Sequence, residues 1–282
     1  MKVAVAQINS VLGDFEKNIN HHAEFCQIAI SENADVIVFP ELSLTGYSLK
    51  DLNYAIALNP GTTDKLDRLK KLSQDISIIC GFAEMGEDYG IYNSAMYIES
   101  GEIKFTHRKN YPPTYGLFEE YRYFSSGDVC KAHDTKLGRV GLLVCEDLWH
   151  ISLPYLQALD GAQVLFGIAA SPTRLTADTG DFKNDTINSE QHRVFSRLLS
   201  VYFVFSNRVG YEDGINFWGG SEIIDPFGRI ISKAKLFEED IIYAEINRGE
   251  IMRARQQARH FLDEDINLTI NNLVRIRESR NK

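Results

Sequence analysis

The sequence predicts a single α/β domain, and three observations lead to this prediction. Short apolar runs of strand character alternate with stretches of helical periodicity along the 282 residues. No Pro-, Gly- or Ser-rich linker divides the chain, and no internal repeat is visible. Domains of this class and length commonly fold as one unit. We therefore expect about ten or eleven strands and interspersed helices around one core.

The first half of the chain alternates strands and helices. Residues 2–8 have strand character, and Asp14 has the character of an N-cap for a helix over residues 15–31. The continuous apolar run 35–39, closed by Pro40, is typical of a strand buried on both faces. The pattern further predicts a helix over 62–73 and strands over 76–83, 91–99 and 102–107.

The second half continues the alternation. Strands are expected over residues 139–144, 163–168, 201–206, 220–224, 229–232 and 241–246, and helices near 153–159 and over 182–199. The last part of the chain is charged and compatible with helix. We expect residues 1–250 to form the main domain and residues 251–282 to form a helical tail, which is a candidate dimer contact.

Composition argues against several classes of protein. No apolar run approaches the ~18–20 residues needed to cross a bilayer. The apolar N-terminal run breaks at Gln7 and Asn9, so no secretory signal is indicated. The net charge is −9 and the basic residues are scattered, which is not the pattern of a nucleic-acid-binding surface. We expect a cytoplasmic protein without a membrane or nucleic-acid partner.

Cysteine and histidine spacing predicts neither disulfides nor a metal site. Cys26, Cys80, Cys130 and Cys145 form no C-x-x-C pair, and the seven histidines show no H-x-x-x-H or H-E-x-x-H spacing. No G-x-x-x-x-G-K-[ST] or G-x-G-x-x-G motif for phosphate binding occurs. We therefore expect no cofactor.

Three chemically capable side chains follow predicted strands. Glu41 comes after the run 35–39, Lys109 after 102–107 and Cys145 after 139–144. Sites of α/β proteins gather at the carboxyl ends of strands. Each residue also has an ordinary structural interpretation: a turn or surface ion pair for Glu41, a solvated edge for Lys109 and a core thiol for Cys145. Cys80 also closes an apolar run, but only Cys145 leads into a polar turn.

The three residue types together suit acyl transfer. A free thiol is only slightly ionised at neutral pH and needs a base, which a partly buried glutamate can be. A lysine can stabilise the developing oxyanion. A nucleophile elbow has glycines two residues before and two residues after the nucleophile. Leu143 and Asp147 occupy these positions around Cys145, so the sequence contains no such elbow there. The spacing of the three residues along the chain leaves their convergence open.

The local sequences resemble the nitrilase, or carbon–nitrogen hydrolase, superfamily with its Glu-Lys-Cys triad. The likeness runs from residues 3–7 to residues 242–246. Within the superfamily, the segments NYPPTYGLFEEYRYF (110–124) and CEDLW (145–149) are most similar to the glutaminase domain of glutamine-dependent NAD synthetases. The resemblance implies an α-β-β-α sandwich that pairs into a homodimer or higher oligomer. It also implies a stand-alone hydrolase, or a subunit that passes ammonia to a partner, because the chain ends at residue 282 without a phosphate loop.

The resemblance also implies roles for individual residues. Glu41 would be the general base, Lys109 the oxyanion stabiliser and Cys145 the nucleophile, with Glu120 as a second glutamate that positions the substrate amine or the lysine. Substrate-binding positions would be Tyr47, Tyr115 and Glu146 near the substrate's amino-acid end, and Ser171 and Arg174 near its carboxylate.

From this we expect a thiol amidohydrolase that acts on a small molecule. Its substrate would be a linear, non-peptide carboxamide, glutamine-like or another small amide, and its products a carboxylate and ammonia. Alternatives within the superfamily are hydrolysis of N-carbamoyl (ureido) acids or nitriles, reverse acyl transfer, and an ammonia-supplying glutaminase subunit of a larger synthetase. A non-catalytic subunit and a redox-sensing cysteine protein are alternatives outside it.

Overall fold

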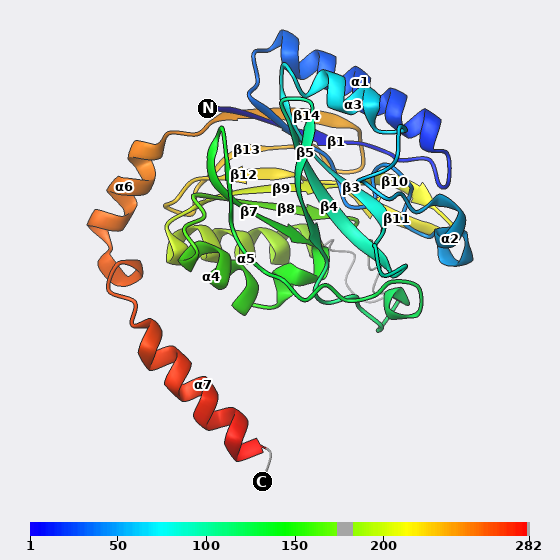
Figure 1. The fold of residues 1–282 in the computed structure, drawn as a ribbon. Coiled ribbons are helices and arrows are strands. Elements are labelled where there is room, and N and C mark those ends of the chain that lie inside the picture. The colour runs from blue at the N-terminus through cyan, green and yellow to red at the C-terminus, as the bar shows by residue number, and fades with distance from the viewer. Residues whose placement is uncertain (174–182, 281–282) are drawn as a thin grey trace.

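The computed structural model describes residues 1–173 and 183–280, and two six-stranded sheets lie face to face at its centre (Figure 1). The first sheet contains, in spatial order, β14 (Asp240–Glu245), β1 (Lys2–Gln7), β2 (Val36–Val38), β3 (Ser77–Met85), β4 (Ile91–Glu99) and β5 (Glu102–Arg108). The second contains β13 (Ile230–Lys233), β12 (Glu222–Ile224), β9 (Tyr202–Asn207), β8 (Val164–Ala169), β7 (Gly138–Val144) and β6 (His133–Thr135).

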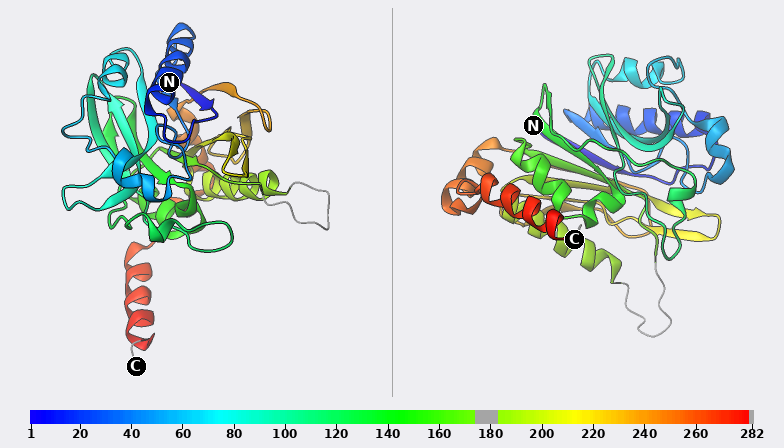
Figure 2. Two further views of the ribbon diagram at one scale, coloured as in Figure 1. Left: turned by 90° about the vertical axis from the view of Figure 1, so that its right-hand side faces the viewer. Right: turned by 60° about the horizontal axis from the view of Figure 1, so that its bottom comes forward.

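Helices cover the outer face of each sheet, as the two views of Figure 2 also show. The first sheet is covered by α1 (Phe15–Ser31) and α3 (Asp67–Leu72), and the second by α4 (Ser152–Leu159) and α5 (Asn184–Leu199). The short helix α2 (Asn53–Ile56) lies in a connection. This arrangement confirms the predicted α-β-β-α sandwich.

The alternation of side chains along a strand explains why β1 is apolar at nearly every position. Val3 and Val5 face the core between the two sheets, while Ala4 and Ala6 face α1. Successive side chains point to opposite faces of a strand, so a strand that is covered on both faces must be apolar throughout. All four side chains are fully buried.

Strand directions bring distant segments to one edge of the sandwich. β1, β2 and β3 are parallel, and β5 runs in the direction of β3 because β4 pairs antiparallel with both. β7, β8 and β9 are also parallel to one another. The carboxyl ends of parallel strands meet at one edge, so the residues that follow β2 and β5 lie together there in the first sheet. Those that follow β7 and β8 lie together in the second.

Two local predictions from the sequence were wrong. Residues 62–66, expected to begin a helix, instead form turns: the N–H groups of Thr62 and Thr63 both donate to the Asn59 carbonyl, and α3 begins only at Asp67. The predicted strand 220–224 begins at Glu222, because Gly220 has φ of +62°, outside the range of a strand.

The sequence interpretation also missed short strands. A hairpin of β10 (Val209–Glu212) and β11 (Ile215–Trp218) turns at Asp213 and Gly214, both with positive φ. Asp-Gly is a favoured sequence for such a turn. The edge strand β6 was missed as well. Phe182, the predicted first residue of the long helix, lies outside the described residues, and α5 begins at Asn184.

The C-terminal part is helical, as predicted, but its two helices differ in how they pack. In α6 (Arg248–Gln257), Ile251 packs into the core of the sandwich and Ala254 is also buried. In α7 (Ile266–Arg280) no residue is buried, and Figure 1 shows this helix leading away from the sheets. In the described part of the chain, no helix combines the length and the apolar character needed to cross a membrane. The division at residue 250 and a dimer contact through the tail remain predictions.

Candidate active site

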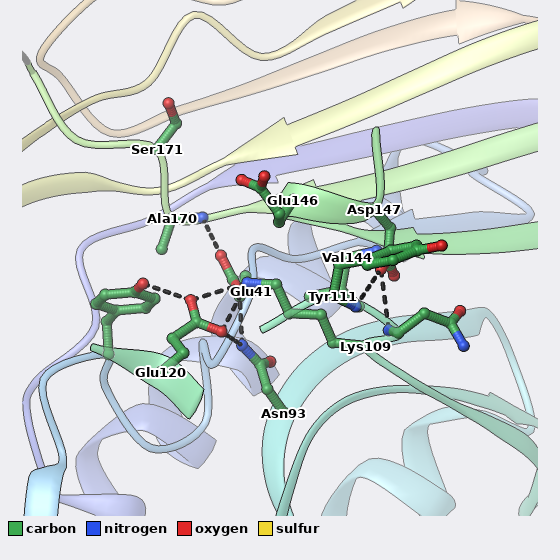
Figure 3. A network of polar contacts seen from close by, with 12 residues as sticks. Glu41, Asn93, Lys109, Tyr111, Glu120, Val144, Glu146, Asp147, Ala170 and Ser171 are labelled. Carbon is green, nitrogen blue, oxygen red and sulfur yellow. Dashed lines mark hydrogen bonds and ion pairs between the residues drawn. The ribbon is translucent and has the colours of Figure 1, made fainter. Parts of the chain in front are cut away.

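A buried lysine lies between two buried glutamates at the edge where the strand ends meet (Figure 3). Lys109, the first residue after β5, places its Nζ 2.8 Å from Oε1 of Glu41 and 2.8 Å from both carboxylate oxygens of Glu120. Lys109 is fully buried, and Glu41 and Glu120 are 1% and 5% exposed. Two carboxylates and one ammonium that are this inaccessible to solvent interact strongly through their charges.

The two glutamates differ in how completely their oxygens are occupied. Besides Lys109, Glu120 accepts the hydroxyl of Tyr47 at 2.5 Å and the side-chain amide of Asn93 at 3.4 Å. A carboxylate offers about four acceptor positions, and those of Glu120 are all filled.

Glu41 offers an acceptor position that none of the described residues fills. Its Oε1 accepts from Lys109 and, at 2.7 Å, from Asn93, while the one donor to its Oε2 within residues 1–173 and 183–280 is the backbone N–H of Ala170, at 2.7 Å. Among the contacts of the described residues, the second position on Oε2 therefore remains available to another proton donor. Ala170 directly follows β8, so this bond also joins the two sheets.

Burial and neighbouring charges shift the pKa values of the cluster. Burial would lower the pKa of Lys109, but the negative charges of Glu120 and Glu41 outweigh it and hold that pKa well above its ordinary value. The pKa of Glu120 is raised by burial, against the effect of Lys109, and the charge of Glu41 raises it further. Lys109 is thus a permanent cation at neutral pH.

Cys145 begins a short 3₁₀ turn, Cys145–Trp149, immediately after β7. Its φ of +48° places it in the left-handed region, which is strained for a residue with a Cβ. Burial raises the pKa of the thiol well above its ordinary value, and Glu41 raises it further while Lys109 lowers it. The resting group is a neutral thiol that lies within electrostatic reach of Glu41 and Lys109.

A cavity of about 160 Å³ lies beside Cys145. Within it, the hydroxyl of Tyr115 donates to Glu146 at 2.7 Å, and Trp218 donates its indole N–H to the hydroxyl of Ser171 at 3.0 Å. The described residues that line the cavity are Tyr115, Phe118, Cys145, Glu146, Trp149, Ser171, Pro172, Asn184, Ile187 and Asn188. The part of the chain that the structure describes contains no cluster of His, Cys, Asp or Glu suited to holding a metal ion.

The structure thus brings most of the predicted site residues together. Glu41, Lys109 and Glu120 are in direct contact, and Cys145, Tyr115, Glu146 and Ser171 line the adjoining cavity. The hydroxyl of Tyr47 donates a hydrogen bond to Glu120, and Tyr47 is not among the described residues that line this cavity. Arg174 lies outside the described residues. Cys80, in contrast to Cys145, is fully buried in the apolar cluster under α1.

Two polar residues in the network were not predicted. Asn93 bridges the two glutamates, and Asp147 accepts backbone N–H groups next to Lys109 and Cys145. A signal for Asn93 existed, because it and Ser94 interrupt the otherwise apolar first part of β4. Asp147 gave none beyond its place in an acidic pair after Cys145.

The fold and this site define a class of protein: an α-β-β-α sandwich with a buried carboxylate–ammonium cluster and a thiol at one edge of its sheets. The chain belongs to the carbon–nitrogen hydrolase family, whose sequence profile matches residues 2–256. It is accordingly an enzyme that hydrolyses carbon–nitrogen bonds, and the family resemblance seen in the sequence is confirmed.

Individual relatives agree with this assignment. The chain is 31% identical to the glutamine-dependent NAD(+) synthetase of Thermotoga maritima, over 90% of this chain and 43% of that protein, and 31% identical to that of Acinetobacter baylyi, over 87% and 44%. It therefore spans less than half the length of these curated relatives. A carbon–nitrogen hydrolase from Helicobacter pylori G27 superposes with a TM-score of 0.82 at 26% identity, covering 97% of this chain and 98% of its own.

Proposed function

We propose that this enzyme hydrolyses a small linear carboxamide, such as glutamine, to a carboxylate and ammonia through a thioester on Cys145. One observation carries the proposal. A buried ammonium lies between two carboxylates, and of these two the carboxylate of Glu41 keeps an acceptor position that no described residue occupies. This arrangement supports Glu41 as the group that exchanges protons and Glu120 as the group that holds Lys109 in place.

In the acylation half-reaction, Glu41 takes the proton of the Cys145 thiol as the sulfur attacks the amide carbonyl. The C–S bond forms, and the carbonyl π electrons move onto oxygen. Lys109 and a backbone N–H stabilise the resulting oxyanion. Glu41 then delivers its proton to the amide nitrogen, the C–N bond breaks, and ammonia leaves behind a thioester.

In the deacylation half-reaction, water replaces ammonia. Glu41 removes a proton from the water molecule while the water oxygen attacks the thioester carbonyl. A second tetrahedral intermediate forms, and the C–S bond then breaks. The proton returns from Glu41 to the sulfur, which restores the neutral thiol. Because the pKa of that thiol is raised, the neutral form is the resting state and a base is needed in every cycle.

The cavity supports a small substrate with a cationic end. A cavity of about 160 Å³ is smaller than typical sites for drug-sized ligands. The carboxylate of Glu146, fixed by Tyr115, lines it beside the thiol and suits a substrate ammonium group. We propose that Tyr115, Glu146 and Ser171 contact the amino-acid end of the substrate, and that Tyr47 acts through Glu120.

The ammonia has a proposed use as well. The curated relatives are glutamine-dependent NAD(+) synthetases, and this chain matches less than half of the length of each. We propose that the ammonia is passed to a synthetase activity, located either elsewhere in the same polypeptide or in a partner protein.

An ammonia-release panel tests the function. Glutamine, asparagine, ω-amides, N-carbamoyl acids, nitriles and short aliphatic amides are compared with wild-type protein and Cys145→Ala. We expect the highest kcat/KM for glutamine or a close analogue and no turnover by the variant. Turnover that survives Cys145→Ala would overturn the thioester mechanism, and exclusive turnover of N-carbamoyl acids or nitriles would overturn the substrate class.

A further inference from the structure

We infer that Asp147 is a positioning residue that fixes Cys145 relative to Lys109. The inference rests on the proposed function, since it concerns the same two reacting groups. Asp147 lies within the turn that begins at Cys145, yet its fully buried carboxylate reaches the other sheet (Figure 3).

Each oxygen of Asp147 holds the backbone beside one of the two reacting groups. Oδ1 accepts the N–H groups of Asn110 at 2.9 Å and Tyr111 at 3.2 Å, the two residues that follow Lys109. Oδ2 accepts the N–H of Val144 at 3.1 Å, the residue that precedes Cys145. One side chain thus joins the end of β5 in the first sheet to the end of β7 in the second.

A histidine completes the coordination of this carboxylate. Nε2 of His107 lies 2.9 Å from Oδ2, and the histidine is 6% exposed. Asp147 therefore faces three backbone donors and one imidazole nitrogen. With hydrogen on Nε2 of His107, all four of these groups donate to the carboxylate and fill its acceptor positions.

Backbone strain at Cys145 explains why such a support is needed. A non-glycine residue with φ of +48° persists only where its surroundings hold it. The bond from the N–H of Val144 to Asp147 holds the backbone on the N-terminal side of Cys145, and the backbone bond from His150 to the Asp147 carbonyl, at 3.2 Å, closes the turn on the other side.

The substitution Asp147→Asn tests the inference with almost no change in shape. An amide has one acceptor oxygen and one donor nitrogen, so its NH₂ group opposes either the two N–H groups that follow Lys109 or the N–H of Val144. We expect the ends of β5 and β7 to separate. Because displacement of reacting groups by about 1 Å costs roughly 10²-fold in rate, kcat should fall by ten- to a hundredfold while KM changes by less than about threefold.

Glu99 offers a matched control. It is also a buried carboxylate that joins the two sheets, since it accepts the N–H of Lys136, between β6 and β7, at 3.1 Å and the hydroxyl of Tyr97 at 3.0 Å. It ends β4, whereas Asn93 in the site lies near the start of that strand. Glu99→Gln should destabilise the fold comparably and leave kcat and KM unchanged.

His107 supplies a second pair of variants. His107→Leu removes one donor to Asp147, while His107→Gln can restore an N–H at that place. We expect His107→Leu to lower kcat and His107→Gln to recover most of it. If Asp147→Asn does not fold, this pair decides the question, because a purely apolar packing role for His107 predicts the opposite order.

The experiment measures thermal unfolding, ammonia release and the rate at which iodoacetamide alkylates Cys145, read by peptide mass spectrometry. The alkylation needs no amide substrate. It therefore tests the role of Asp147 even if Cys145→Ala still releases ammonia and the proposed function is wrong. Support is a loss of both kcat and Cys145 alkylation in Asp147→Asn beyond that in Glu99→Gln. Equal rates in Asp147→Asn and Glu99→Gln, or His107→Leu as active as His107→Gln, would overturn the inference.

Discussion

Replacing Lys109 by methionine removes the ammonium at the centre of the site and keeps the apolar stem. Nζ makes three contacts of 2.8 Å with the oxygens of Glu41 and Glu120, and none of these groups is more than 5% exposed. The cluster changes from one positive and two negative charges, a net of −1, to a net of −2. Of the residues that the structure describes, the amide of Asn93 alone would still bridge the two carboxylates.

The magnitudes follow from this loss. Breaking a buried ion pair by removing one partner costs about 3–5 kcal/mol of unfolding free energy, and uptake of a proton by Glu120, whose pKa is already raised by burial, offsets part of that. Losing an oxyanion donor costs about 2.7–4 kcal/mol, which corresponds to roughly 10²–10³-fold in kcat. Lys109→Met should therefore be both less stable and nearly inactive.

A double variant separates these two effects. In Lys109→Met/Glu120→Gln the net charge returns to −1, so urea unfolding should show most of the stability restored. Ammonia release should stay as low as in Lys109→Met, because the oxyanion still lacks its cation. A kcat within about tenfold of wild type in the single variant, or activity regained in the double variant, would refute the role of Lys109.

Three further predictions concern Cys145, His22 and Glu212. Because the pKa of the Cys145 thiol is raised, the absorbance at 240 nm of wild type minus Cys145→Ser should show no thiolate at pH 7; a thiolate band there would mean a preformed ion pair. Burial lowers the pKa of His22 to about 3, below its ordinary 6.5, so the unfolded state binds the extra proton and stability falls as pH falls below 6.5. Between pH 7.5 and 5 this amounts to about 2 kcal/mol, which urea unfolding of His22→Gln should lack; equal slopes would contradict it. Glu212, buried with Arg208, accepts the N–H of Tyr47 at 2.9 Å, so Glu212→Gln should lower kcat about tenfold or more, and an unchanged kcat would show that Tyr47 needs no such support.

The proposed reacting groups could be predicted because the end of a strand is marked by the residues immediately around it. An apolar run that ends in a polar residue marks the end of a strand, and this rule placed Glu41, Lys109 and Cys145 each at the carboxyl end of its own strand. It also separated Cys145 from Cys80, since only the former leads into a polar turn. The convergence itself depends on strand order and on how the two sheets face each other, which no local pattern encodes.

The residues that support the site were harder to find for a related reason. Asn93 lies within a strand and acts across to neighbouring segments, and Asp147 acts on backbone N–H groups 36 and 37 residues away. Such bonds are determined by tertiary structure and leave no periodic trace. The missed hairpin differs, because the Asp213-Gly214 turn was readable from the sequence.

The most direct test of the account is to identify the acylated residue. Wild-type enzyme is mixed with its best amide substrate, quenched in acid within the first turnovers, and digested for mass spectrometry. We expect the peptide that contains Cys145 to gain the mass of the acyl group, and Cys145→Ala to show neither this adduct nor ammonia. An acyl group on any other residue, or ammonia released by enzyme whose Cys145 is fully alkylated, would contradict the account.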